Sequence, residues 1–161
     1  MWNIFKDIVI SYDFSVIYKI LLGAVLCGII GLERQSLNKP AGFKTHIIIG
    51  LSAVLVMILG EYMAGKYGAN AVDPTRLPAQ LLAGIGFIGA GTILRDGFKV
   101  KGLTTAASIL GVTCIGLAVG AGFYLGAIMM TLIIYFVLSH MTRITRKLVK
   151  NRKIDEEEEH E

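Results

Sequence analysis

The sequence predicts an all-α fold: a polytopic transmembrane helical bundle with five spans, an outside N-terminus and a cytoplasmic C-terminus. Two observations lead to this prediction. First, the 161 residues are 54% hydrophobic and only 17% charged, and their mean hydropathy is +0.64. A soluble domain of this length leaves too much of its surface exposed to hide so much apolar material, so the excess is expected to face lipid. Second, the lysines and arginines lie mostly on one side of the apolar stretches.

Five apolar stretches match the thickness of a bilayer. Windows of about 19 residues place them at 14–32, 45–64, 74–94, 103–119 and 120–138. At about 1.5 Å per residue, each is close to a hydrocarbon core of about 30 Å. The last two meet at a Gly120 to Gly122 turn, which predicts a tight helical hairpin, with one long broken helix as the alternative. Charged residues follow the first stretch where a cleavage site would need small ones, so we expect no signal peptide.

The distribution of cations predicts the orientation. One side of the spans collects Arg34, Lys39, Lys44, Arg95, Lys99, Lys101, Arg143, Arg146, Lys147, Lys150, Arg152 and Lys153. The other side has Lys6, Lys19, Lys66 and Arg76. Because cytoplasmic loops carry an excess of lysine and arginine, the first side is predicted to be cytoplasmic. The net charge of +4 then reflects topology in the lipid bilayer, and no nucleic-acid partner is expected.

The chain divides into two predicted regions. Residues 1–140 form the transmembrane domain, and residues 141–161 form a cytoplasmic basic amphipathic helix followed by an acidic disordered tail. Within the first region, the Asp-Gly pair in 94–101 predicts a small β-hairpin between the third and fourth spans. Its lysines are expected to point toward headgroups or an acidic partner.

Lys19 and Glu61 are ionisable residues that fall inside the predicted spans, where charge is costly. Lys19 and Glu61 have similar depths on the outer side. One interpretation is that each side chain snorkels to the interface, and the other is an ion pair joining the first two helices. Cys27 and Cys114 lie in apolar helices and are expected to be structural thiols, so we expect no disulfide, metal or cofactor.

The third span begins with the densest polar sequence, Asp73-Pro74-Thr75-Arg76. Asp73 is suited to cap exposed N–H groups, and proline needs no donor at the first helical position. The alternative is a site in which Asp73 binds a hydrated cation or pairs with Arg76 in a lumen. Gln80, a turn later, needs a hydrogen-bond partner at membrane depth.

Small residues recur on several predicted helices. The run at 84–91 formally contains the dinucleotide fingerprint G-x-G-x-x-G, which we reject because it lies inside an apolar span and does not follow a strand. Close helix packing is the expected role of Gly84, Gly86, Gly89, Gly91, Gly116, Gly120, Gly122 and Gly126. Packing within one protomer is the first interpretation. Packing between protomers is the alternative, and it gives the working hypothesis of a homodimer.

Several ordered motifs resemble a known family. They are Gly31-Leu32-Glu33-Arg34-Gln35, Lys39-Pro40-Ala41-Gly42-Phe43-Lys44-Thr45-His46, Asp73-Pro74-Thr75-Arg76, Gly84-Ile85-Gly86-Phe87-Ile88-Gly89-Ala90-Gly91-Thr92-Ile93 and Gly102-Leu103-Thr104-Thr105-Ala106-Ala107-Ser108. Together they closely resemble the membrane domain of the MgtC/SapB family of bacterial inner-membrane proteins, over about residues 14–138. Many members carry a soluble C-terminal domain, and this chain looks like the short SapB-type form. It departs from the family's usual residues at Lys44, Pro78 and Ile109-Leu110.

The resemblance implies a multi-pass protein linked to growth in low magnesium, acid stress and, in pathogens, survival inside host cells. It implies regulation of other membrane machinery, including the F-type ATP synthase, and direct magnesium transport as an alternative. The positions carried over from its motifs are Glu33, Arg34, Lys44, Thr45, His46, Asp73, Arg76, Thr104 and Thr105. His46 has no His or Cys companion nearby, so a hydrogen bond at a helix start is expected there instead of a metal ion.

Three classes of function stay open on the residues themselves. A regulator would dock on a partner through the glycine-lined helix faces, and the short loops favour this class. A transporter would need a polar path, part of which Asp73, Gln80, Thr92, Thr104 and Thr105 could line. An enzyme would need a nucleophile or an acid and base pair, and we find no such set, so no enzymatic activity is expected.

Overall fold

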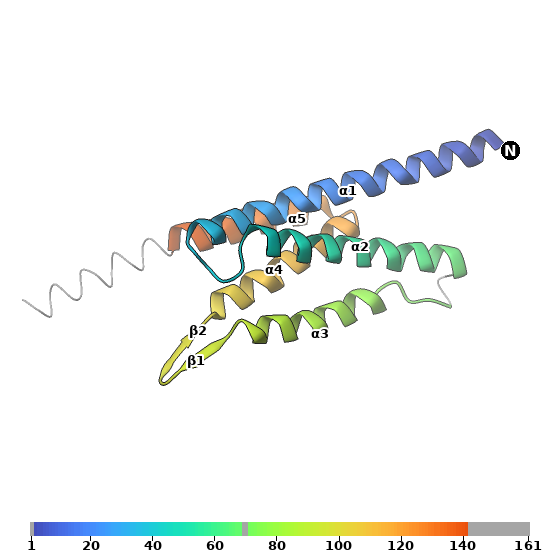
Figure 1. Ribbon diagram of the computed structural model, residues 1–161. Coiled ribbons are helices and arrows are strands. Elements are labelled where there is room, and N and C mark those ends of the chain that lie inside the picture. Colours follow the sequence, from blue (N-terminus) through green and yellow to red (C-terminus); the bar gives the residue numbers. More distant parts are fainter. Residues whose placement is uncertain (1, 69–70, 142–161) are drawn as a thin grey trace, which may run out of the picture.

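The computed structural model describes residues 2–68 and 71–141, with the side chains of 14–68 and 71–140. The elements are α1 (Trp2–Ser36), α2 (Phe43–Tyr67), α3 (Arg76–Gly91), β1 (Leu94–Asp96), β2 (Lys99–Lys101), α4 (Leu103–Gly120), α5 (Tyr124–Phe136) and the π-helical η1 (Val137–Met141). The helices run roughly alongside one another, and the hairpin of β1 and β2 extends from one end of the bundle (Figure 1). The predicted basic helix and acidic tail lie almost wholly outside the described residues.

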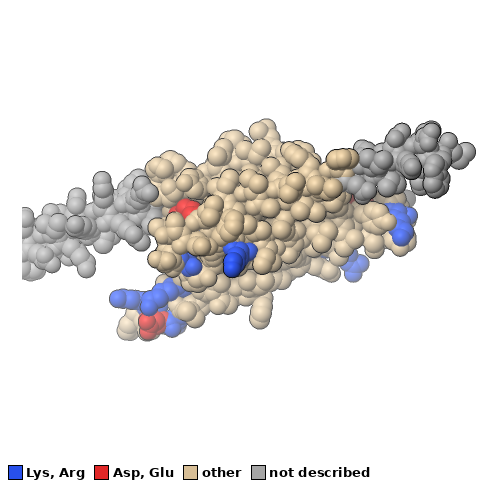
Figure 2. Space-filling model, turned by 45° about the horizontal axis from the view of Figure 1, so that its top comes forward, with Lys and Arg blue, Asp and Glu red and all other residues tan. Residues whose placement is uncertain are grey.

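Three of the described helices are long and apolar enough to cross a membrane. These spans are Phe14–Ser36, Phe43–Tyr67 and Leu103–Gly120, and a shorter apolar helix runs over Tyr124–His140. The prediction of a mostly helical protein with apolar spans is therefore confirmed, whereas three of the five predicted spans are found as candidate spans among the described residues. Helix α3, with 16 residues, is shorter than the stretch predicted at 74–94. On the face in Figure 2, most charged atoms lie toward the two ends, one Lys or Arg patch lies further in, and uncharged residues form most of the surface between them.

The turn between the last two helices is confirmed. Helix α4 ends at Gly120, Gly122 has a φ of 76°, and α5 begins at Tyr124. A positive φ is costly for residues with a Cβ and easy for glycine, so the chain reverses at Gly122. The alternative of one long broken helix is wrong.

The predicted hairpin is also present. Its strands are antiparallel, with Leu94 opposite Lys101, Arg95 opposite Val100, and Asp96 opposite Lys99. Gly97 adopts a φ of 59° in the connecting turn, which is the conformation that favours glycine after aspartate in tight hairpins.

The core lies mainly between α1, α2 and α4. Cys27, Ile30, Val54, Val112, Ile115 and Val119 are fully buried in it. The helices approach closely because Gly116 of α4 faces the backbone of Gly50, where an added Cβ would collide with the Gly50 carbonyl oxygen. The thiol of Cys27 donates to the carbonyl of Val112 at 3.6 Å, and Cys114 is exposed.

At the end of the bundle away from the hairpin, a lysine joins three helices. Lys19 Nζ of α1 lies 3.5 Å from Glu61 Oε2 of α2 and donates to the carbonyl of Gly120, the last residue of α4, at 2.6 Å. The ion-pair interpretation of Lys19 and Glu61 is thus confirmed. The lysine is only 14% exposed, so its charge is held by these acceptors.

Candidate functional site

A cluster of buried polar side chains lies at the hairpin end of the bundle. We call Glu33, Arg34, His46, Thr105 and Ser108 the buried polar cluster, since all are at most 8% exposed. They come from the last turns of α1, the first turn of α2 and the start of α4. The sequence motifs that carry them are far apart along the chain, and the fold brings them to one place.

The charged half of the cluster ties α1 to η1. Arg34 Nε lies 2.5 Å from Glu33 Oε2, and Arg34 Nη2 donates to the carbonyl of Leu138 at 3.4 Å. With the arginine side chain 1% exposed, the guanidinium has little water to solvate it. A buried charge of this kind is strongly destabilising when its partner is removed.

The imidazole half of the cluster joins α2 to α4. His46 Nδ1 lies 2.8 Å from the carbonyl of Gly42, and Nε2 lies 3.0 Å from Ser108 Oγ. Because a carbonyl only accepts, Nδ1 carries a proton. The Ser108 hydroxyl also donates to the carbonyl of Thr105 at 2.8 Å, so one hydroxyl proton faces two acceptors unless Nε2 is protonated as well. The hydrogen bond expected for His46 at the helix start is present.

A glycine sets the distance between the two halves. A Cβ added at Gly31 of α1 would lie 2.8 Å from the Cα of Phe43 and 3.0 Å from the Cβ of His46. The first distance is too short for a real side chain and the second is tighter than most real contacts, so glycine is what allows α1 to pass this close to α2. The Gly31-Leu32-Glu33-Arg34 motif therefore combines a close approach with the two charges that follow it.

One carboxylate oxygen of the buried polar cluster is free to accept a hydrogen bond. In the part of the chain that the structure describes, Glu33 Oε1 is buried and has no hydrogen-bond partner. A carboxylate oxygen in that position can accept a bond from a water or another donor. Among the same residues, no group of three or more His, Cys, Asp or Glu side chains could hold a metal ion.

The other predicted cytoplasmic-side residues surround the cluster on the surface. Lys44 and Thr45 of α2 are exposed, as is Thr104 of α4, whereas Thr105 is 2% exposed. Ser108 is the member that motif reasoning did not select. The sequence feature that could have identified Ser108 is its position three residues after Thr105, which places both side chains on one face of a helix.

Asp73, Arg76 and Gln80 lie toward the end of the bundle that is opposite the buried polar cluster. Asp73 is not the N-cap of α3, which is Thr75. Instead, Asp73 Oδ1 accepts bonds from the Thr75 hydroxyl at 2.7 Å and the Thr75 backbone N–H at 2.8 Å. These two bonds hold the pKa of Asp73 below its usual range, with a smaller contribution from the charge of Arg76. Gln80 is exposed on α3.

The glycines of α3 differ from those of α4. Added Cβ atoms at Gly84, Gly86 and Gly91 would meet nothing within 4 Å in the described structure, and one at Gly89 would only touch Ala106. At Gly116 and Gly120 of α4, added atoms would instead collide with the Gly50 carbonyl oxygen and with Met57 respectively, and one at Gly126 of α5 would collide with Phe123. The small residues of α3 thus leave an open face, whereas those of α4 are used inside the bundle.

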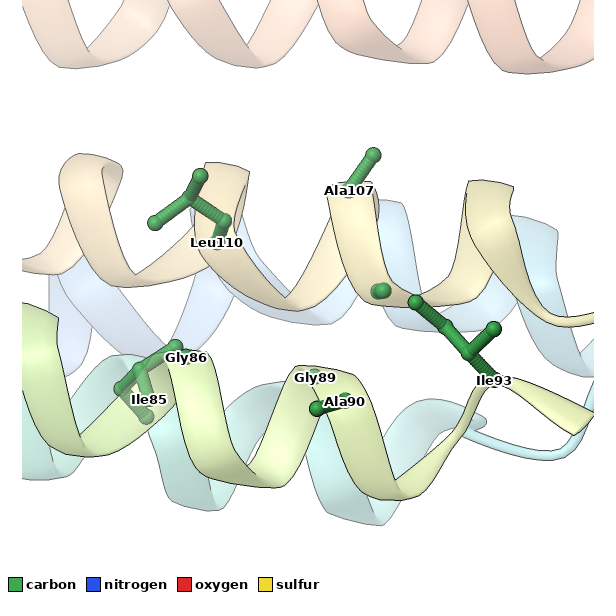
Figure 3. A pocket seen from close by; sticks show the side chains of 8 residues that line it. Ile85, Gly86, Gly89, Ala90, Ile93, Ala107 and Leu110 are labelled. Atoms are coloured by element: carbon green, nitrogen blue, oxygen red, sulfur yellow. The ribbon is translucent and has the colours of Figure 1, made fainter.

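An apolar groove of about 300 Å³ follows this open face. It is lined by Ile85, Gly86, Gly89, Ala90, Ile93, Ala106, Ala107 and Leu110. Figure 3 shows that one wall comes from α3 and the other from α4, with Ile93 at the end where α3 gives way to the hairpin. Such a groove has the shape and chemistry to accept an apolar chain or helix.

The fold and these sites define a helical membrane protein with interacting polar and charged side chains at both ends of its core. Residues 20–147 match the model of the MgtC family. Protein SapB of Bacillus subtilis (strain 168) is 41% identical over 144 residues, which cover 87% of this chain and 62% of that protein. The chain belongs to the MgtC family, and the resemblance seen in its motifs is confirmed.

Two further relatives have names that bear on function. "Putative magnesium transporter YhiD" of Escherichia coli (strain K12) is 42% identical over 132 residues, covering 78% of this chain and 61% of that protein. Protein MgtC of Brucella abortus (strain 2308) is 37% identical over 118 residues, which cover 73% of this chain and 48% of that protein. The chain thus spans about three fifths of the length of the first relatives. No solved structure matches it.

Proposed function

We propose that this chain is a multi-pass protein of the bacterial cytoplasmic (inner) membrane that serves magnesium homeostasis by binding and regulating other membrane proteins. Its N-terminus is outside and its C-terminus inside, as the cation distribution favours. The family and the name of the YhiD relative support the link to magnesium. The setting is adaptation to low magnesium, with acid stress and survival inside host cells as the related conditions that the family resemblance implies.

The observation that carries the regulatory role is the open face of α3. Its glycines have free space in front of them, and Phe87 on the same helix is 84% exposed. Helices associate in membranes where small residues let two backbones approach and pack. The occupant that we propose is a transmembrane helix of another protein, with the F-type ATP synthase as the candidate and a second copy of this chain as the homodimer alternative.

The packing of the described core is less suited to transport through a single protomer. Buried hydroxyls inside the bundle bond within their own helices, as Thr113 does to the carbonyl of Ile109 at 2.9 Å and Thr131 to that of Ala127 at 2.8 Å. The polar positions considered for a path are also divided, since Gln80 is exposed on α3 and Thr105 is buried at the start of α4. A magnesium transporter, favoured by the name of the YhiD relative, is the second candidate, and we propose no enzymatic activity.

The test uses capture from native membranes of magnesium-starved cells after crosslinking. Gly86→Leu fills the open face, whereas Gly65→Leu is a matched control because Gly65 of α2 also meets nothing within 4 Å. We expect a specific membrane complex with the wild type and the control, and its loss with Gly86→Leu. Equal capture by all three chains would contradict docking on α3, and magnesium flux in liposomes of the purified wild type would favour the transporter.

A further inference from the structure

We propose that the hairpin of β1 and β2 is a lipid-binding element, which inserts Phe98 among the lipids and binds anionic headgroups with Arg95, Lys99 and Lys101. The proposal is independent of the regulatory role and rests on the proposed orientation only in naming the leaflet, the cytoplasmic one. The evidence is the position of the hairpin, the exposure of its apolar side chains, their arrangement on its two faces, and its charge.

The hairpin is held at the level of a membrane surface. It follows α3 after two residues and precedes α4 after one, Gly102. Because α4 is a candidate membrane span from its first residue, Leu103, the hairpin starts where the span meets the headgroups. Phe98 lies five positions before Leu103, which at about 3.6 Å per residue reaches at most about 18 Å. Figure 1 shows the hairpin diverging from the bundle at the end where α1 and η1 also end.

Its apolar side chains are uncovered. Phe98 at the tip is fully exposed, Leu94 is 64% exposed and Val100 is 51% exposed. Contact of these side chains with water is unfavourable, and phenylalanine and leucine are among the side chains that interfacial segments bury at the boundary between headgroups and acyl chains. A purely structural turn between two helices would not need phenylalanine at its most exposed position.

The register shows that the apolar residues do not share one face. Opposite residues in an antiparallel pair have side chains on the same face, so Leu94 lies with Lys101, and Val100 lies with Arg95 on the other face. A flat protein surface would cover only one of these faces. Lipid can surround both faces and the tip, which is why we favour lipid over an acidic protein partner.

The charge of the hairpin matches anionic headgroups. Arg95, Lys99 and Lys101 are exposed, and the acid of the hairpin, Asp96, accepts a bond from Lys101 at 3.2 Å. Three cations and one acid leave a net charge of +2 on 94–101. Clusters of lysine and arginine beside a span attract anionic lipid, and here they flank the exposed aromatic ring.

The sequence offers a clean fluorescence test because it contains a single tryptophan, Trp2. In a Trp2→Phe background, Phe98→Trp reports on the tip, and Ala71→Trp reports on an exposed loop at the other end of the bundle. The full chain is placed in vesicles of phosphatidylcholine, with or without phosphatidylglycerol, and with lipids brominated near the headgroup. Both leaflets have the same composition, so the direction of insertion does not matter.

We expect the tryptophan at 98 to emit at shorter wavelength and to be quenched several times more by brominated lipid than the tryptophan at 71, most strongly with phosphatidylglycerol. Changing Arg95, Lys99 and Lys101 to Gln should remove that dependence on anionic lipid. A tryptophan at 98 that is quenched by aqueous acrylamide and spared by brominated lipid would overturn the proposal. So would shielding that appears only when other membrane proteins are added, and so would equal quenching in both lipid mixtures.

Discussion

Single residues link the helices at the hairpin end of the bundle, and Ser108 is the one whose loss is simplest to interpret. Ser108→Ala removes the contact with His46 Nε2 and leaves a buried ring nitrogen without its partner. A buried polar atom left unsatisfied costs about 1–3 kcal/mol, so we expect the free energy of unfolding in detergent micelles to fall by that amount. Ser52→Ala is the control, because Ser52 is exposed and bonds to the carbonyl of Ile48 in its own helix. Equal effects of the two changes would show that the bond between α2 and α4 contributes nothing.

Asp73 is a second residue with a measurable role. Bonds from Thr75 lower its pKa from the ordinary value of 3.8, so they stabilise the fold above pH 3.8, and this contribution is lost as the pH falls through the lowered pKa. Thr75→Val removes the hydroxyl bond and keeps the backbone one. We expect the pKa of Asp73 to rise toward 3.8 in a carboxyl NMR titration, while Thr75→Ser leaves it low. An unchanged pKa in Thr75→Val would mean that the hydroxyl bond is not formed.

At the scale of elements, Lys19 connects α1, α2 and α4, and a double-mutant cycle can measure that connection. Glu61 is 38% exposed, so its coupling to Lys19 is screened and should be about 0.5 kcal/mol. Lys19→Met should destabilise more than Glu61→Gln, because it also removes the bond to the Gly120 carbonyl. Lys66→Met is the control for loss of a surface cation. Additive effects of the Lys19 and Glu61 changes on the free energy of unfolding would rule out the pairing.

Glycines at two contrasting positions test which helices pack together. A Cβ at Gly116 would collide with the Gly50 carbonyl and lie 2.8 Å from Ala53 Cβ, so Gly116→Ala should destabilise by about 1–3 kcal/mol through overpacking. Gly86→Ala meets open space and should be neutral or stabilise by up to about 1 kcal/mol. Thermal unfolding of the purified variants compares them directly. The opposite order would place the tight helix contact at α3.

The hydropathy pattern predicts the elements better than their ends. The hairpin and the turn after Gly120 were predicted from Asp-Gly and Gly-x-Gly, because these short sequences carry local conformational information. The hydropathy pattern placed the start of the third helix at Pro74 instead of Arg76, since a window average does not detect the turn that Asp73 and Thr75 make. It also placed the first helix from residue 14, whereas α1 begins at Trp2.

The buried polar cluster shows why sites are harder to predict than spans. Glu33 and Arg34 follow an apolar stretch, so the sequence predicts that they form the charged cytoplasmic end of the first span. Burial of Arg34 depends on the carbonyl of Leu138, 104 positions away, and no local pattern contains that information. The motifs selected four of the five cluster members but also Lys44, Thr45 and Thr104, which lie on the surface.

In the molecule as a whole, two parts have different roles. Polar contacts at the two ends of the core hold α1, α2 and α4 together, whereas α3 and the hairpin carry the exposed features. At one end, Lys19 joins α1 to Glu61 of α2 and to the Gly120 carbonyl of α4. At the other end, His46 joins α2 to Ser108 of α4, and Arg34 joins α1 to η1. Helix α3 packs mainly on α2 and α4, and it carries the open glycines, the groove and the hairpin. The core thus maintains the structure, and α3 with the hairpin combines the groove, the open glycine face and the exposed cations in one part of the molecule.

The orientation of the molecule is the property on which the cytoplasmic assignments depend. Exposed cations gather at the hairpin end, where Arg95, Lys99 and Lys101 lie, and such residues are retained in the cytoplasm. With Cys114→Ala as background and Cys27 buried, Asp96→Cys reports on the hairpin and Ala71→Cys on the other end. We expect a membrane-impermeant maleimide to label Ala71→Cys in intact spheroplasts and Asp96→Cys only after permeabilisation. Labelling of Asp96→Cys from outside would reverse the orientation, and it would move the lipid-binding hairpin to the outer leaflet.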